Sequence, residues 1–211
     1  MANVEYRAFL TDDFDDVARI VGQTWHEGPD ERDRWLQGAA DLANCLRRTT
    51  CGRVAIARGR VVGFVLVRAG GVDPAEDALW ARRRDEALAE LAARNASAAA
   101  DFAAYAQAEE RIDARLLRES GCDERFEVVL FIMAPEARGL GAGGALFDWA
   151  RDALARGGAR EYFLYTDDSC TWGFYEHRGL RRTAEWHPPA SARDLLLSGY
   201  YVYAGECCGQ A

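Results

Sequence analysis

A glycine-rich turn is the part of this sequence whose residues most directly suggest chemistry. The run Arg138-Gly139-Leu140-Gly141-Ala142-Gly143-Gly144 separates an apolar stretch, Glu127–Met133, from a helical one, Ala142–Arg156. Glycines leave backbone N–H groups unobstructed, and the first N–H groups of a helix attract negative charge. The turn therefore predicts an anion site, most naturally for a phosphate or a pyrophosphate.

The composition excludes several other chemistries. All 26 basic residues are Arg, so the chain lacks both the Lys of a Walker phosphate loop and the Lys amine of Schiff-base catalysis. The formal net charge of −8 argues against binding to a nucleic-acid backbone, which requires clusters of basic residues. We therefore expect no nucleic-acid partner.

The termini, cysteines and histidines bear on location and metal binding. The segment Met1–Asp13 has no apolar core like that of a secretion signal, and no stretch reaches the ~20 apolar residues that cross a bilayer. The 6 cysteines show no C-x-x-C spacing, which favours reduced thiols in a domain of this size. The 3 histidines are scattered without ligand spacing. These patterns predict a cytoplasmic protein with no membrane association and no metal site.

The first part of the chain has the pattern of a strand, two helices and a β-hairpin. Val4–Leu10 is rich in strand formers, and Thr11 stands as an N-cap before the first amphipathic helix. A second helical stripe follows. The β-rich runs Arg53–Ala57 and Val61–Arg68 then flank Arg58-Gly59-Arg60, which is typical of a hairpin.

The segment at about 73–121 is expected to be a helical insertion. From Val72 to Ser120 there is no glycine, and apolar or small residues recur at a spacing of three and four. Asn95 and Glu109 interrupt this stripe. We therefore expect a helical hairpin that breaks near Arg94–Ser97, with one long helix as the alternative.

After Gly121 strands and helices alternate. The predicted strands Glu127–Met133 and Glu161–Thr166 flank the predicted helix Ala142–Arg156, an order typical of a parallel pair joined by a crossover. The fold expected is therefore α/β, with a mixed, mostly antiparallel central sheet, one parallel strand pair at the anion site, flanking helices and the helical insertion, all in a single domain over 1–211. The last predicted elements are a short helix, Thr171–His177, and two strands, Leu180–Glu185 and Leu195–Tyr203.

The glycine spacing also fits a dinucleotide-binding fingerprint. Gly139, Gly141 and Gly144 match G-x-G-x-x-G, and Asp167 and Asp168 end the next predicted strand. In a Rossmann fold, however, the first glycine follows its strand almost directly, whereas here the residues 134–138 intervene. A Rossmann-type oxidoreductase is therefore a distant alternative.

The intervening residues carry a closer resemblance. Ala134-Pro135-Glu136-Ala137 followed by Arg138–Gly143 resembles the acetyl-CoA signature R/Q-x-x-G-x-G/A of the GCN5-related N-acetyltransferase (GNAT) superfamily. The later segment Phe174–Leu180 is similar to the family's F-Y-x-x-x-G-F segment, and two motifs in order are far more specific than one. The resemblance covers 124–183, extends over 4–67 and does not include the insertion. Asp168 and Leu180 depart from it, since many members have Asn and Phe there.

The resemblance implies acetyl-CoA as the acetyl donor and names its binding residues. The backbone of Phe131, Ile132 and Met133 would pair with the pantetheine amides, and the Met133 N–H would polarise the thioester carbonyl. The turn would hold the pyrophosphate through Arg138, Gly139, Leu140, Gly141, Ala142, Gly143 and Gly144.

Two residues are the catalytic candidates that the resemblance implies. Tyr175 matches the family's general-acid tyrosine, which protonates the departing CoA thiolate. Glu127 stands at the start of the signature strand, where some members place a catalytic Glu, and is the expected base. Glu27 and His26 would also face the acceptor.

The acceptor is expected to be a primary amine, either of a small molecule or of a peptide, and the acetyl group to move by direct transfer. Trp25, Trp172 and Trp186 are candidates to wall its pocket, because an aromatic ring face attracts a cation. The main rival is a non-catalytic acyl-CoA-binding or regulatory module, and a homodimer stays open.

Overall fold

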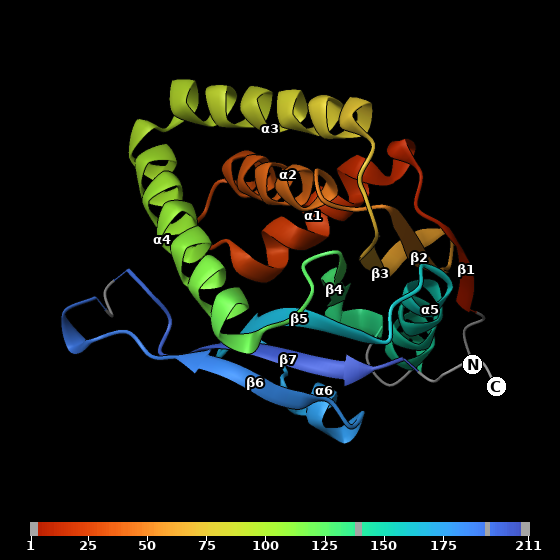
Figure 1. Cartoon of the computed structure of the whole chain (residues 1–211). Helices are drawn as coiled ribbons and strands as arrows, with labels where there is room; N and C mark the ends of the chain where they lie inside the picture. Colours follow the sequence, from red (N-terminus) through yellow and green to blue (C-terminus); the bar gives the residue numbers. More distant parts are fainter. Residues whose placement is uncertain (1–3, 138–140, 193–194, 208–211) are drawn as a thin grey trace.

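One mixed sheet organises the chain. The computed structural model describes residues 4–137, 141–192 and 195–207, and within them the strand order is β1-β2-β3-β4-β5-β7-β6 (Figure 1). Neighbouring strands are antiparallel except β4 and β5, which are parallel, so the predicted fold class is confirmed. The strands are β1 (Val4–Ala8), β2 (Cys51–Ala57), β3 (Arg60–Ala69), β4 (Phe126–Met133), β5 (Glu161–Asp167), β6 (Arg181–Trp186) and β7 (Tyr200–Glu206).

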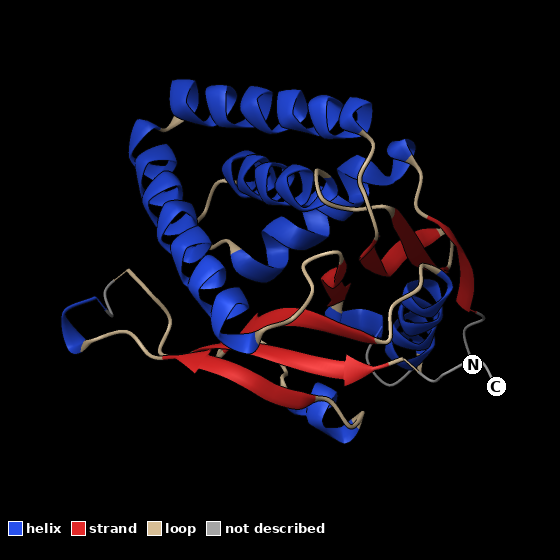
Figure 2. Cartoon of the chain, in the orientation of Figure 1, coloured by secondary structure: helices blue, strands red, loops and turns tan. Residues whose placement is uncertain are grey.

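Helices cover both faces of this sheet (Figure 2). Alternate residues of β3 point to opposite faces, so Phe64 and Leu66 join one buried cluster while Val65 and Val67 join another. The helices α1 and α2 pack on the first face and α5 packs on the second. The helices are α1 (Phe14–Trp25), α2 (Glu31–Leu46), α3 (Pro74–Arg94), α4 (Ala96–Ser120), α5 (Ala142–Arg156) and α6 (Gly173–His177).

The start of the first helix differs from the prediction. Thr11 is not its N-cap, because Thr11–Asp13 forms a 3-10 turn ahead of α1. Asp13 is 6% exposed and takes over the polar role, accepting the Leu10 N–H at 2.8 Å and the Arg7 guanidinium at 2.6 Å. A buried carboxylate with these partners holds β1 to the helix entrance.

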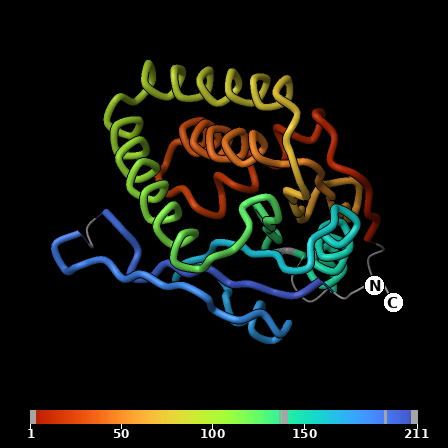
Figure 3. Tube along the Cα trace, in the orientation of Figure 1, coloured from red at the N-terminus to blue at the C-terminus, as the bar shows by residue number. Residues whose placement is uncertain are grey.

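The hairpin between β2 and β3 is confirmed. Arg58 and Gly59 lie at the turn with φ of 53° and 73°, as a two-residue turn with two left-handed positions requires. Both strands belong to the central sheet, and Figure 3 traces them from the second helix into the turn.

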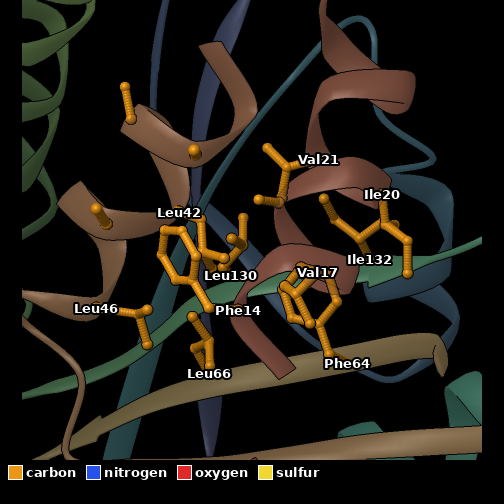
Figure 4. Close-up of a cluster of buried hydrophobic side chains, with 14 of the residues drawn as sticks. Phe14, Val17, Ile20, Val21, Leu42, Leu46, Phe64, Leu66, Leu130 and Ile132 are labelled. Atoms are coloured by element: carbon orange, nitrogen blue, oxygen red, sulfur yellow. The ribbon is translucent and has the colours of Figure 1, made fainter. Parts of the chain in front are cut away.

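The cluster between the sheet and the first two helices is tightly packed (Figure 4). Phe14 and Val17 of α1 meet Leu42 of α2 above Phe64 of β3. The two helices approach closely because of Gly38, where a Cβ would collide with the backbone of Ala18 and Gly22.

The segment predicted as a helical insertion forms two helices with the predicted break. Asn95 ends α3 and caps α4, its side chain accepting the Ala98 N–H at 3.1 Å. The second helix does not fold back along the first as a hairpin would, and Figure 1 shows it turning away and descending to the C-terminal strands, where it contacts β6 and β7. The cause is burial, because Ile112 and Leu116 pack against the sheet residue Phe163.

The last elements shift by a few residues from their predicted bounds. The helix α5 spans Ala142–Arg156 as predicted and ends in a glycine pair, with Gly158 at φ of 92°. The final strand begins at Tyr200 rather than Leu195, whose side chain is 45% exposed and contributes little to the core. The predicted order of strand, helix and strand around the glycine turn therefore holds.

Candidate active site

The parallel strands β4 and β5 separate after a single bridge. Glu127 pairs with Phe163, and no further pair joins the described parts of the two strands. On the other side of β4, Ala134 donates its N–H to the Val62 carbonyl at 2.9 Å. Because successive N–H groups of a strand alternate in direction, those of Met133 and Phe131 face β5. The gap thus presents two backbone donors with no ladder partner among the described residues, while the Ile132 N–H faces β3.

The glycine turn lies at the end of β4, and its described part is tightly packed. Gly141, at φ of 73°, is the N-cap of α5. A Cβ on Gly143 would lie 3.3 Å from Met133 Cγ, and one on Gly144 would lie 2.7 Å from Arg178 Nη2. The two glycines therefore let Met133 and the Arg178 guanidinium pack directly against the start of the helix. Free N–H groups at a helix N-terminus beside a guanidinium suit an anion.

Several residues of the predicted anion site are placed only in part. Arg138, Gly139 and Leu140 lie outside the described residues. Ala142 begins α5 and is 1% exposed, so it can offer its backbone only. Arg178 was not among the predicted ligands, and its Nη1 donates to Asp148 at 2.5 Å.

Tyr175 lies on α6, beside this gap. Its ring centroid is 5.8 Å from that of Phe147 and 6.0 Å from that of Tyr203. Burial raises the pKa of Tyr175 well above its usual value, and the charges of Cys170 and Asp167 act in the same direction. No described residue hydrogen-bonds its hydroxyl, which is therefore protonated and available as a donor.

The two residues that depart from the resemblance have structural roles. Asp168 accepts hydrogen bonds from the Tyr201 and Ser198 hydroxyls, each at 2.6 Å, and these bonds lower its pKa. Its carboxylate therefore fastens the loop before β7. Leu180 is 6% exposed and packs in the core.

The structure argues against Glu127, the predicted base. Its side chain is 3% exposed, and both carboxylate oxygens accept from Arg48 Nε at 3.2 Å. The guanidinium thus occupies both oxygens that would have to take a proton from the amine. The residue instead forms a charge pair between the turn after α2 and β4.

The three tryptophans predicted to wall one pocket do not share one. Trp172 packs on Tyr201 and Trp186 packs on Tyr200, with ring centroids 6.5 Å and 6.1 Å apart. Tyr200 and Tyr201 are consecutive in β7, so they face opposite sides of the sheet. Trp25 is 37% exposed at the end of α1.

His26 and Glu27, which were also predicted to face the acceptor, follow the end of the first helix and differ in exposure. Glu27 is exposed. His26 is partly buried, with its Nε2 atom 2.7 Å from an oxygen of Asp41, and its ring packs on Phe102 of α4. The histidine therefore links the end of α1 to α2 and α4.

A group of polar side chains on α4 was missed by the sequence prediction. Two side-chain contacts join this helix to β5. Leu116 packs in one cluster with Phe163, and the Tyr165 hydroxyl donates to the Asp113 carbonyl oxygen at 3.3 Å. One turn further on, Glu109 comes within electrostatic range of the end of β5.

Glu109 is a weak acid in this setting. Burial raises the pKa of Glu109 to about 7, with the negative charges of Asp41 and Asp167 adding to the rise. The Tyr105 hydroxyl donates to it at 3.3 Å and acts in the other direction. The available signal was its place in the apolar stripe, because a carboxylate on the packed face of a helix must have a polar environment.

Two searches of the described residues found nothing. No described helix is long and apolar enough to cross a membrane. Within the same residues, no group of three or more His, Cys, Asp or Glu side chains is arranged to hold a metal ion.

Solved structures resemble this chain over almost its whole length. A protein assigned to the GNAT family of acetyltransferases, from Desulfovibrio desulfuricans, has a TM-score of 0.56 at 15% identity, with 98% of this chain and 100% of that one covered. SsHAT has a TM-score of 0.61 at 19% identity, and an aminoglycoside 6'-N-acetyltransferase complexed with coenzyme A has 0.57 at 12%; each match covers 98% of this chain and 99% of the other. Such identities show a shared fold. No family profile and no curated protein matches the sequence.

Proposed function

We propose, from the premise that this chain has the fold of GNAT-family acetyltransferases, that it is an acetyl-CoA-dependent N-acetyltransferase. The acceptor is the primary amine of a small molecule or a peptide. The acetyl group moves directly from the thioester to the amine.

The gap between β4 and β5 is the observation that carries this proposal. Parallel neighbours normally continue their ladder, whereas here only Glu127 and Phe163 pair. The unpaired edge of β4, with the N–H groups of Met133 and Phe131, suits an extended chain of amides such as a pantetheine arm. The first turn of α5 lies where that arm would end, at Gly143.

Each part of the gap has a task in acetyl transfer. Acetyl-CoA supplies, when bound, an acetyl group activated as a thioester. The Met133 N–H donates to the thioester oxygen, and such a donor contributes about 10²–10³ in rate. The first turn of α5, from Gly141 to Gly144, and the Arg178 guanidinium bind the pyrophosphate, together with Arg138, Gly139 and Leu140.

Tyr175 is the general acid in this proposal. Its hydroxyl is protonated, unpaired among the described residues and adjacent to the gap, so it protonates the thiolate as it leaves. Burial also raises the pKa of the nearby Cys170 thiol, which is therefore a poor nucleophile. This favours direct transfer over an acetyl-cysteine intermediate.

Ligand binding and turnover together test the proposal. Acetyl-CoA and CoA should raise the unfolding temperature, since a ligand at about 100 times its Kd adds ~2.7 kcal/mol of stability. NAD(P) and FAD serve as controls for a dinucleotide-binding site and should have no effect. CoA release is then followed with spermidine, kanamycin, tyramine and an alanine-initiated peptide as acceptors.

The outcomes separate the candidates. Stabilisation by acetyl-CoA with CoA release on at least one amine supports the proposal. Stabilisation without release on any amine favours the non-catalytic acyl-CoA-binding module. Stabilisation by NAD(P) or FAD but not by CoA would overturn both.

A further inference from the structure

We propose that Glu109, on the helix α4, is the general base that accepts the proton of the amine, an inference that rests on the proposed acetyl transfer. The reaction requires such a group, because an alkylamine with a pKa of about 10 arrives protonated at neutral pH. Glu127 cannot serve as this base, because both of its carboxylate oxygens accept a hydrogen bond from Arg48.

The path of α4 brings Glu109 to the gap. Successive contacts step along the two elements in opposite directions, from Leu116 with Phe163 to Asp113 with Tyr165. One helical turn before Asp113 lies Glu109, and the negative charge of Asp167, at the end of β5, raises the pKa of its carboxyl group.

Asp167 marks the level of the reacting carbonyl. The bridge between Glu127 and Phe163 sets the register of the parallel pair, and both strands rise by about 3.3 Å per residue. A β-bulge at Val129 takes up one residue of β4, so Ile132, five residues beyond the bridge, stands level with Asp167, four residues beyond it on β5, and the donors Phe131 and Met133 flank that level. Glu109 therefore lies at the level of the backbone donors that would hold the thioester.

Glu109 and Tyr175 lie on opposite sides of the sheet. Tyr175 packs with Phe147 in the cluster under α5, whereas α4 packs on the other face through Leu116. Direct transfer needs this division, because the amine attacks one side of the carbonyl and the thiolate leaves from another. A base on the α4 side and an acid on the α6 side fit an acceptor that enters beneath α4.

The proton transfers balance with these two residues. The ammonium of the acceptor gives one proton to the Glu109 carboxylate, and the neutral nitrogen then attacks the carbonyl carbon. The C–N bond forms, the C–S bond breaks, and the thiolate takes the Tyr175 proton. The second nitrogen proton, released as the amide forms, restores Tyr175 through water, and Glu109 returns its proton to solvent.

The surroundings of Glu109 suit a base that works near neutral pH. With a pKa of about 7, it is ionised at pH 8 and still basic enough to take a proton. The titratable and charged groups that face it are Tyr105 and Asp113 on α4, Asp41 and Cys45 on α2, Arg48 in the turn after α2, Asp167 on β5 and Tyr200 on β7.

The pH dependence of turnover tests this role. With an amine from the panel that supports CoA release, kcat/KM of the wild type should fall on the acid side of about pH 7. Glu109→Gln should lower kcat/KM at pH 7.5 by about 100-fold and remove that acid limb. The deficit should narrow above about pH 9, where more of the alkylamine is already neutral. Glu110→Gln is the matched control, because Glu110 is the exposed neighbour on α4, and it should retain wild-type turnover.

A second variant tests the base without removing it. Asp41→Asn deletes a negative charge that raises the pKa of Glu109, so the acid limb should move to lower pH while turnover persists. A structural role for Glu109 alone would leave the limb where it is. Because the Glu109 carboxylate remains in place, this variant still tests whether Glu109 is the general base if Glu109→Gln does not fold.

The results distinguish this inference from the function on which it rests. No CoA release by the wild type on any amine overturns the acetyltransferase proposal and the base with it. Turnover by the wild type with an acid limb that is unchanged in both Glu109→Gln and Asp41→Asn overturns the base alone.

Discussion

Tyr175 shows how burial sets the role of a single residue. Its hydroxyl has no hydrogen-bond partner among the described residues, and its pKa is raised by burial, so at neutral pH it can only donate. Its ring contacts with Phe147 and Tyr203 hold that donor in place and do not depend on the oxygen.

Removal of the Tyr175 hydroxyl should therefore affect chemistry more than binding. We expect Tyr175→Phe to lower kcat by about 100-fold, with the KM for acetyl-CoA nearly unchanged, because a general acid contributes at least that much. Steady-state CoA release measures both constants. Tyr6→Phe, on the edge strand β1, is the control and should be silent. Wild-type kcat in Tyr175→Phe at all pH values would refute the acid role.

The ion pair of Arg48 and Glu127 is a second feature at this scale. Its contribution to stability depends on the burial of Glu127. The Glu127 side chain is 3% exposed, so the loss of Arg48 would leave an uncompensated charge inside the protein. We expect Arg48→Met to reduce the free energy of unfolding by about 3 kcal/mol in a urea titration.

The double variant provides the control for this pair. Arg48→Met with Glu127→Leu removes both charges and should recover most of the lost stability, since an apolar pair can replace a buried ion pair. An unchanged free energy of unfolding in Arg48→Met alone would show that the pair is not the stabilising contact described above.

At the scale of elements, the contact between α1 and α2 depends on a missing side chain. A Cβ on Gly38 would collide with backbone atoms of Ala18 and Gly22, which cannot move aside as a side chain can. Gly38→Ala should cost about 1–3 kcal/mol of stability in thermal or urea unfolding. Gly71→Ala is the matched control, because a Cβ there would meet nothing. Equal effects of the two substitutions would contradict the close packing.

Local patterns predicted some elements closely and others only in kind. The helix α5 has its predicted bounds, and the turn of the hairpin has its glycine, because caps and turn residues act within a few positions. The direction of α4 after Asn95 could not be predicted, since it depends on which sheet residues, such as Phe163, offer apolar area. The same packing of α4 places Glu109 within electrostatic range of Asp167, at the end of β5.

At the scale of the whole molecule, α4 joins the two halves of the structure. It follows α3, which packs on α2, and it buries Ile112 and Leu116 on the C-terminal strands. The region 73–125 also holds 13 of the 34 acidic residues and 8 of the 26 basic ones. With 13 acidic and 8 basic residues, this region carries a net charge of −5 of the chain's −8. The region therefore contributes packing between the two halves and more than half of the net negative charge.

Because α4 packs on the C-terminal strands, the helices and the sheet should unfold in one cooperative transition. We expect Leu116→Ala, at a position with 0% exposure, to lower the free energy of unfolding by about 2–5 kcal/mol. Circular dichroism and tryptophan fluorescence should report the same shifted midpoint, because the helix and the sheet would unfold together. Arg115→Ala, its exposed neighbour, is the control. Two separate transitions would argue against a single domain.

The sequence by itself determined the order of the elements, the glycine turn before α5 and the position of Tyr175 after β5, because these follow from local spacing and from residue type. Only the tertiary structure decided that Arg48 neutralises Glu127 and that Glu109 comes to the end of β5. Burial and the charges of distant residues set the protonation of a carboxylate, and both arise only when the chain is folded.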